Sequence, residues 1–225
     1  MNQDNRPRGT IRLRTTTDRE RARPQPSTAA DPARIADADT VLTKAVPQAR
    51  IAGRGVLQVN LNWPAAAGAD LDLGCMASFA DGSGGPVQPL GKAFGSLSQW
   101  PYVELDQDDR TGASSDGETL RVNLDRRELF RQLLFYVYVY EGAVDFRRLG
   151  ATATVTAPAG SFRIALDDSP DGATGCAIAL ATPGPGGLTV RREVRWYTGT
   201  RRHSVQQLMD RTYGFGFEWV WMTKD

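Results

Sequence analysis

The segment from Leu105 to Glu118 carries the residues of this chain best suited to chemistry. It holds five carboxylates and two glycines, and the acids are Asp106, Asp108, Asp109, Asp116 and Glu118. Carboxylates crowded on a short loop repel one another unless a cation neutralises them. Glycines let such a loop turn, so that backbone carbonyls can also face inward. The segment therefore predicts a site for a hard cation.

Two more carboxylates, Asp70 and Asp72, lie upstream in an apolar segment. Residues at alternate positions of a strand point to the same side, so both acids can face one point. Calcium suits such a set because it takes roughly six to eight oxygen ligands and tolerates irregular geometry, whereas magnesium keeps more of its waters. We therefore predict a Ca²⁺ site shared by the two acidic segments if they meet in space, with Mg²⁺ as the alternative ion.

Other interpretations fit the same acids. Asp106, Asp108 and Asp109 can cap turns at a strand end, with Arg110 as an ion-pair partner, and this requires no metal. Paired acids can also act in a glycosidase or hold a metal-bound water in a hydrolase. However, the sequence contains no nucleophile elbow, phosphate-binding loop or Cys-x-x-Cys pair, and a single histidine, His203, excludes a multi-histidine metal centre. We therefore expect a protein that is not an enzyme.

Short strands must position these acids. Leu57, Val59 and Leu61 alternate with polar residues, which is typical of a half-buried strand. Similar runs, separated by Gly, Pro and Asp clusters, predict further strands at 71–79, 119–124, 133–140, 152–157, 161–166, 176–181, 188–197 and 215–222. Many short strands with frequent turns indicate a mainly β fold, a two-sheet antiparallel β-sandwich with a few short helices.

The segment 133–140 is apolar on both faces, which predicts a central strand. Its tyrosines, Tyr136, Tyr138 and Tyr140, share one face and could stack on a sugar or a base, although we favour a packing role. Two helices are predicted by capping-box spacing. Asp125 and Glu128 would begin the first, which would run on through Leu129 and Leu133; Ser204 and Gln207 would begin the second, with Val205, Leu208 and Met209 on its apolar face.

The N-terminal part differs from the rest in charge. Residues 1–54 contain eleven Lys and Arg against six Asp and Glu, whereas residues 55–225 contain sixteen against twenty. We predict a disordered basic tail over residues 1–50 and one folded domain over 51–225. The tail could contact nucleic acid or an anionic membrane, but Asp4, Asp18 and Glu20 interrupt its charge run, so we favour a solvated extension.

The sequence also bears on location. It has no apolar run near the roughly 20 residues of a membrane span and no secretory signal, so we expect a cytoplasmic protein without a transmembrane segment. Cys75 and Cys176 each lie in an apolar strand-like segment, which predicts buried free thiols rather than a disulfide.

Several ordered motifs resemble the TerD-like tellurium-resistance and stress-response family, and most closely its TerA-type branch. They are DLDLGC at 70–75, QPLG at 88–91, FGSL at 94–97, Tyr102, DDRTG at 108–112, YEG at 140–142, CAIA at 176–179 and YGFGFEWV at 213–220. The resemblance covers about residues 55–222 and leaves out the basic tail. It implies a two-sheet β-sandwich without catalytic activity, and a role in resistance to tellurite and other stress.

The resemblance also implies calcium ligands and partners. Matched position by position, the ligands would be Asp70, Asp72, Asp108, Asp109, Asp116 and Glu118, whereas Asp106 is added from its charge and place alone. The implied partners are other tellurium-resistance proteins and an integral-membrane protein, which would bring the chain to the inner face of the bacterial membrane. The implied function is a scaffold or sensor component; the alternative is calcium-dependent recognition of lipid headgroups or sugars.

This chain departs from the family pattern after the Thr-Gly pair. TerD-type sequences have a longer acidic loop there, whereas this chain reads Ala113-Ser114-Ser115-Asp116-Gly117-Glu118. Gln107 and Asp109 also replace the Gly and Asn that usually flank the first Asp of this loop. We therefore expect one calcium ion rather than two.

Overall fold

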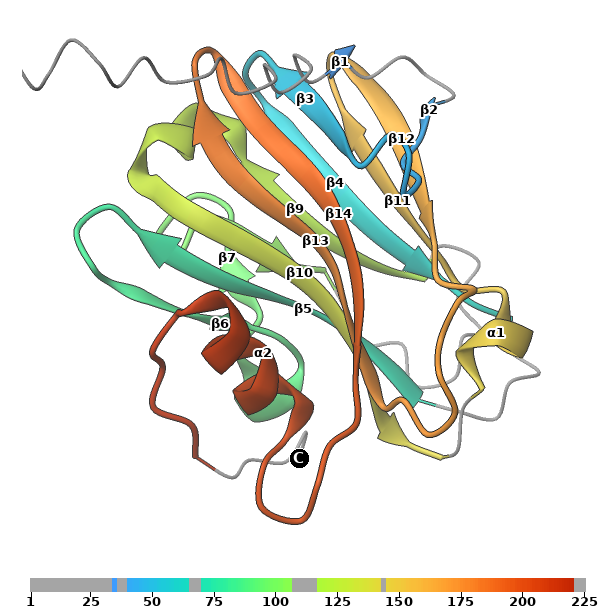
Figure 1. Cartoon of the computed structure of the whole chain (residues 1–225). Helices are drawn as coiled ribbons and strands as arrows, with labels where there is room; N and C mark the ends of the chain where they lie inside the picture. Colours follow the sequence, from blue (N-terminus) through green and yellow to red (C-terminus); the bar gives the residue numbers. More distant parts are fainter. Residues whose placement is uncertain (1–33, 36–39, 65–69, 107–116, 143–144, 221–225) are drawn as a thin grey trace, which may run out of the picture. The chain divides into compact units, whose positions relative to one another are not determined.

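The computed structural model describes residues 34–35, 40–64, 70–106, 117–142 and 145–220. All of them belong to a compact unit that spans Ala33–Asp225. No helix among them is long and apolar enough to cross a membrane. Most of the described residues lie in two stacked β-sheets (Figure 1).

Seven strands form the first sheet. Their order is β1 (Arg34–Ile35), β3 (Gln48–Ala52), β14 (Gly187–Tyr197), β13 (Gly175–Gly184), β10 (Phe130–Glu141), β5 (Asp70–Phe79) and β6 (Gly84–Val87). All neighbours pair antiparallel except β1 with β3. The long apolar strand β10 lies between β13 and β5, which confirms the predicted central strand.

Seven further strands form the second sheet. Their order is β2 (Thr40–Val41), β12 (Gly160–Ala165), β11 (Thr152–Ala157), β4 (Val56–Asn62), β9 (Glu118–Asn123), β8 (Val103–Leu105) and β7 (Gly95–Ser96). Only β2 and β12 pair parallel. The inward residues of β4, Leu57, Val59 and Leu61, are fully buried in the core between the sheets. The predicted two-sheet sandwich is therefore confirmed.

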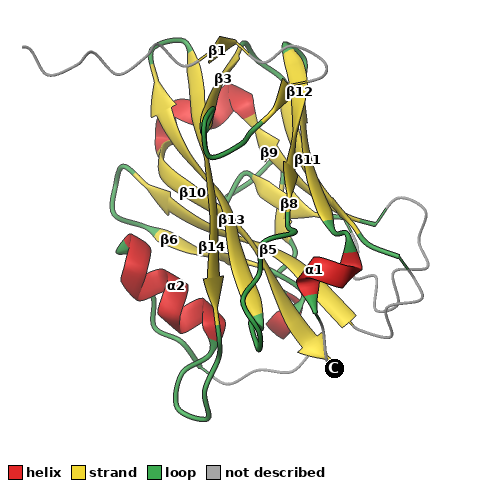
Figure 2. Ribbon diagram, turned by 45° about the vertical axis from the view of Figure 1, so that its right-hand side comes forward, coloured by secondary structure: helices red, strands yellow, loops and turns green. Residues whose placement is uncertain are grey.

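The helices are short, as expected. They are η3 (Leu90–Lys92), η4 (Leu124–Leu129), α1 (Phe146–Leu149) and α2 (Val205–Tyr213). Helix α2 lies on the outer face of the first sheet, as Figures 1 and 2 show. There Val205 and Met209 pack with Tyr136, Tyr138 and Met76 in a second apolar cluster. This cover explains why β10 is apolar on both faces.

The predicted helix starts have different outcomes. The capping box of Ser204 and Gln207 is present, with N–H to O distances of 3.2 and 2.9 Å. The helix predicted from Asp125 is wrong: the structure has a 3₁₀ helix, Leu124–Leu129, whose cap is Asn123, two residues earlier. Asp125 accepts hydrogen bonds from Arg54 and the Gly55 N–H instead. Leu133, assigned to the same helix, lies in β10.

The predicted strand at 215–222 is also wrong over its described residues, Phe215–Val220, which join no sheet. This C-terminal arm, Gly214–Val220, follows α2 directly, and the Asp210 carboxylate accepts the N–H groups of Gly216 and Phe217 at 2.6 and 2.9 Å. These two N–H groups therefore cannot form the backbone hydrogen bonds that would pair the arm with a strand. Conversely, the sequence pattern does not predict the short strands β1, β2, β3, β6, β7 and β8.

Both cysteines are buried and free, as predicted. They lie in β5 and β13 of the first sheet. Burial raises the pKa of the Cys75 thiol, and it also raises that of Cys176. Thiols that stay protonated and covered are poor nucleophiles and poor metal ligands.

Candidate functional site

Acidic residues from both sheets meet at one end of the sandwich. Asp70 and Asp72 begin β5, and Glu118 begins β9 of the other sheet. Beyond its pairing with β6, which starts at Cys75, the first part of β5 has an open edge. Glu118 reaches across to this edge, where its Oε2 accepts the Leu73 N–H at 2.6 Å. This contact places Glu118, the last acid of the second acidic segment, beside β5.

Asp72 and Glu118 are both fully buried, at 0 % exposure. Asp72 lies opposite Tyr138 in the β5–β10 register. Burial raises the pKa of Tyr138, and the negative charge of Asp72 raises it further, with a smaller contribution from Glu118. Both carboxylates thus act on the same hydroxyl. Placing two buried negative charges in one neighbourhood is costly unless positive charge or hydrogen bonds compensate them.

Asp106 and Asp70 lie at the margins of this region. Asp70 is buried, and in the strand register it lies opposite Glu141 at the end of β10. The Asp106 carboxylate accepts the Thr119 N–H at 2.9 Å and contacts Arg121 at 3.4 Å. Asp106 therefore caps a strand end with its carboxylate, which is the role that the sequence offered as the alternative to metal binding.

Asp108, Asp109 and Asp116 lie outside the described residues. Their segment joins Asp106 to Gly117, and both of its ends lie at this acidic end of the sandwich, because the Asp106 N–H donates to the Thr119 carbonyl at 3.0 Å. Among the described residues, no three His, Cys, Asp or Glu side chains form a group that could hold a metal ion. The donors that are described, Asp70, Asp72 and Glu118, offer only oxygen, the ligand type of calcium and magnesium.

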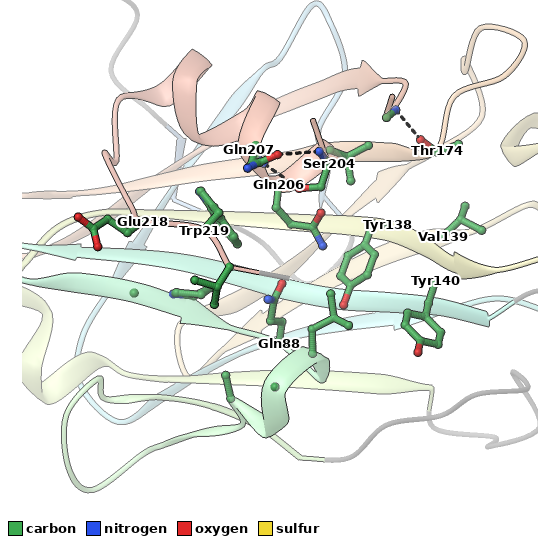
Figure 3. A pocket seen from close by; sticks show the side chains of 18 of the residues that line it. Gln88, Tyr138, Val139, Tyr140, Thr174, Ser204, Gln206, Gln207, Glu218 and Trp219 are labelled. Carbon is green, nitrogen blue, oxygen red and sulfur yellow. Dashed lines mark hydrogen bonds between the residues drawn. The ribbon is translucent and has the colours of Figure 1, made fainter. Parts of the chain in front are cut away.

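A pocket on the outer face of the first sheet was missed by the sequence analysis. It has a volume of about 590 Å³ and lies between α2, β10, the C-terminal arm and the turn at Gln88–Ala93 (Figure 3). The arm is held by buried Asp210, which also accepts the Trp219 indole N–H at 2.7 Å. The only signal in the sequence was a polar residue, Asp210, on the buried side of a short helix.

By its architecture this protein is a two-sheet β-sandwich with buried acidic residues at the ends of strands from both sheets. Comparison with known proteins shows which proteins of this architecture it resembles. The chain is 33 % identical over 190 residues to the tellurium resistance protein TerA of an Alcaligenes species. That match covers 78 % of this chain but 54 % of the relative, so the chain spans about half the length of the relative it matches. No family model matches the sequence.

One solved structure supports the fold. A crystal structure of a homologue of the telluride resistance protein TerD from Streptomyces coelicolor A3(2) superposes with a TM-score of 0.51 and 19 % identity, over 67 % of this chain and 94 % of that one. A protein of unknown function, SAV2460, has a TM-score of 0.48 and 16 % identity over the same shares. The chain is thus similar in sequence to a tellurium resistance protein, TerA, and shares its fold with the TerD homologue.

Proposed function

We propose that this protein is a calcium-binding, non-enzymatic component of a bacterial tellurium-resistance and stress-response system. The observation that carries the calcium proposal is a pair of fully buried carboxylates from different sheets: Asp72, which lies opposite Tyr138, and Glu118, which accepts the N–H of the next residue, Leu73. A bound dication would supply the positive charge that such a pair favours.

The proposed ligands fall into two groups. Asp70, Asp72 and Glu118 would hold the ion from the strand ends, and Asp108, Asp109 and Asp116 would complete its oxygen shell from the connecting segment. Asp106 is the weakest of the predicted ligands, because its carboxylate already serves the Thr119 N–H and Arg121. A site built from both sheets would tie ion binding to the integrity of the whole sandwich.

The proposed cellular role rests on the relative. A protein with the TerA name is similar to this chain over most of the chain's length, which supports partners among other tellurium-resistance proteins. We further propose assembly at the inner membrane through an integral-membrane partner. Affinity capture from the native host, with and without a calcium chelator, tests both the tellurium-resistance partners and the integral-membrane partner. Recovery of the same unrelated proteins in both conditions would contradict the proposal.

Thermal unfolding with and without millimolar calcium tests the metal site. Calcium at about 100 times its Kd would add about 2.7 kcal/mol to the free energy of unfolding, a rise of about 5 °C or more in Tm for a chain of this size. Asp72→Asn should abolish this rise. No shift in the wild type, or an unchanged shift in Asp72→Asn, would reject the calcium site.

A matched control is available on the same strand. Asp81 follows the opposite end of β5, where its carboxylate accepts the Ser83 N–H and hydroxyl in an exposed turn. Asp81→Asn removes one carboxylate far from the proposed site, so the calcium-induced rise in Tm should be retained. Magnesium at equal concentration should give a smaller rise.

A further inference from the structure

The pocket beneath α2 contains a buried amide that the fold does not use. Gln206 is 4 % exposed, yet no described residue hydrogen-bonds its side-chain amide. In Figure 3 this side chain descends from α2 toward the sheet, with Trp219 on one side and Tyr138 on the other. Its neighbour Gln207 contrasts with it, because the Gln207 amide completes the capping box with Ser204.

A second amide faces the first. Gln88 is 5 % exposed, and its Oε1 accepts the Tyr136 hydroxyl at 2.7 Å. That bond fixes which end of the amide is free: its Nε2 has no hydrogen-bond partner among the described residues. In Figure 3 the Gln88 amide points up toward Gln206. The two glutamines therefore offer two N–H₂ groups and one carbonyl oxygen to an occupant, and the hydroxyl of Tyr138 lines the same pocket.

Both side chains are largely covered, at 4 % and 5 % exposure, but their amide atoms are not among the buried polar atoms that lack a partner. The amide groups therefore face the open space of the pocket, where an occupant can reach them. The volume of about 590 Å³ lies within the usual range of small-molecule sites. An occupant that pairs with both amides accounts for the arrangement.

The rest of the lining restricts the chemistry of that occupant. Among the described residues that line the pocket none is Lys, Arg or His, and the one charged residue is Glu218. A phosphate or carboxylate would therefore meet no positive charge. The rings of Tyr138 and Trp219 offer flat faces on which a planar molecule can stack, and the indole of Trp219 is held in place by Asp210.

We propose that this pocket binds an uncharged planar heterocycle with a lactam edge, of the uracil type. A carboxamide pairs with such an edge through two hydrogen bonds, because the lactam presents an N–H and a carbonyl side by side. Gln206 would make this bidentate pair, Gln88 would donate to a further ring carbonyl, and an aromatic side chain would cover the ring. A sugar could stack as well, and the experiment below therefore includes monosaccharides as a contradicting outcome. The pocket adjoins the proposed calcium site, because Tyr138 lines the pocket and lies opposite Asp72, but the proposed binding does not require calcium.

Titration of the full chain with uracil and with 1,3-dimethyluracil, followed by calorimetry and by tryptophan fluorescence, tests the proposal. The two probes differ in the lactam N–H, so uracil should bind saturably and the dimethyl compound at least about 10-fold more weakly. Uridine should bind, and its 5′-monophosphate should bind more weakly than uridine. No saturable binding of uracil or uridine at millimolar concentration, or equal affinity for the dimethyl compound, would overturn the proposal. A stronger response to monosaccharides would also overturn it.

Gln206→Met separates binding from folding. The variant should keep a Tm near that of the wild type, because no described residue hydrogen-bonds the amide that it removes, and should lose affinity for uracil at least about 10-fold. Unchanged affinity would overturn the role of Gln206. Gln58→Met, on the exposed side of β4 in the other sheet, is the matched control and should bind as the wild type does. If Gln206→Met does not fold, the comparison of the two probes on the wild type still decides.

Discussion

Gly74 in β5 leaves room for the ring of Tyr136, which comes from the neighbouring strand β10. The ring of Tyr136 lies over the Gly74 Cα, and a Cβ added there would lie 2.3 Å from the Tyr136 Cζ. The same ring is held by its hydrogen bond to Gln88. Because Tyr136 is fully buried and has a fixed partner, the ring cannot move aside cheaply.

We therefore predict that Gly74→Ala lowers the free energy of unfolding by about 1–3 kcal/mol, as overpacking of a core does. Urea unfolding of the variant measures this. Gly85→Ala is the matched control, because a Cβ at Gly85 would meet only Trp100 at an ordinary 3.5 Å. A loss of stability in Gly85→Ala as large as that in Gly74→Ala would contradict the steric explanation.

Asp168 joins separate parts of the chain through its carboxylate. It accepts the Trp196 indole N–H at 3.0 Å and pairs with Lys44 at 3.0 Å and with Arg192 at 3.8 Å. Partial burial acts to raise the pKa of Asp168, but the hydrogen bonds from Trp196 and Lys44 and the nearby positive charges outweigh it and hold the pKa below its ordinary value of 3.8.

This lowered pKa gives a prediction for pH dependence. Because the folded state favours ionised Asp168, its contribution to stability is present above about pH 4 and is lost as the pH falls below that through the folded pKa. Asp168→Asn should cost about 1 kcal/mol at pH 7, and the difference from the wild type should shrink at pH 3 and below. Urea midpoints across this range measure it, with Asp167→Asn as the exposed control. A cost of Asp168→Asn that does not change with pH would exclude the linkage.

At the scale of elements, the C-terminal arm is held by one side chain. Asp210 in the last turn of α2 accepts three N–H groups, from Gly216, Phe217 and the Trp219 indole. Phe215, Phe217 and Trp219 then pack on the outer cluster of the first sheet. A Cβ at Gly84 would lie 2.9 Å from the Phe217 ring, which shows how closely the arm lies on β6.

Asp210→Asn should release the arm, because the amide nitrogen of Asn cannot accept a hydrogen bond and the remaining bonds lose their charge. We expect a loss of about 2 kcal/mol in the free energy of unfolding and faster chymotrypsin cleavage at Phe215 and Phe217. Asp171→Asn, an exposed carboxylate in a loop, should leave the arm resistant to cleavage. Unchanged cleavage of Asp210→Asn would show that the aromatic contacts alone hold the arm.

The elements that the sequence predicted correctly are those with a long period-two pattern. β4, β11 and β14 have clear alternation or long apolar runs, and their predicted bounds lie close to the observed ones. The arm has the same alternation in Phe215, Phe217 and Trp219, yet it forms no strand, because its N–H groups go to a side chain nine or fewer residues away. Periodicity indicates which side of a segment is buried. It does not indicate whether the backbone N–H groups of that segment bond a neighbouring strand or a side chain.

At the scale of the whole molecule, part of the candidate site could be predicted because its acids lie at the ends of strands that the sequence pattern reveals. Alternation placed Asp70 and Asp72 on one strand, and the contact of Glu118 with Leu73 N joins them to the second acidic segment. The pocket under α2 could not be predicted in this way. Its amides, Gln88 and Gln206, come from distant parts of the chain, and a lone glutamine has no motif around it.

Glu118 spans the two sheets, and its substitution distinguishes a structural role from a metal-binding one. In Glu118→Gln the side-chain carbonyl can still accept the Leu73 N–H, while one of the two negative charges that act on Tyr138 disappears. Without calcium we therefore expect the Tm to stay equal to that of the wild type or to rise, because a buried charge has been removed. With calcium, the rise seen in the wild type should fall to less than about one third, because an oxygen ligand has lost its charge.

The exposed carboxylate of Glu128 in η4 provides the control, since Glu128→Gln should retain the full calcium response. Thermal unfolding of the three proteins at several calcium concentrations separates the explanations. A Glu118→Gln variant that is much less stable without calcium, but still gains the full stabilisation with it, would make Glu118 a structural link between the sheets and remove it from the proposed ligands. The opposite result, an unchanged or higher Tm without calcium together with a lost calcium response, would support Glu118 as a ligand, because the cation would then be what compensates its buried charge.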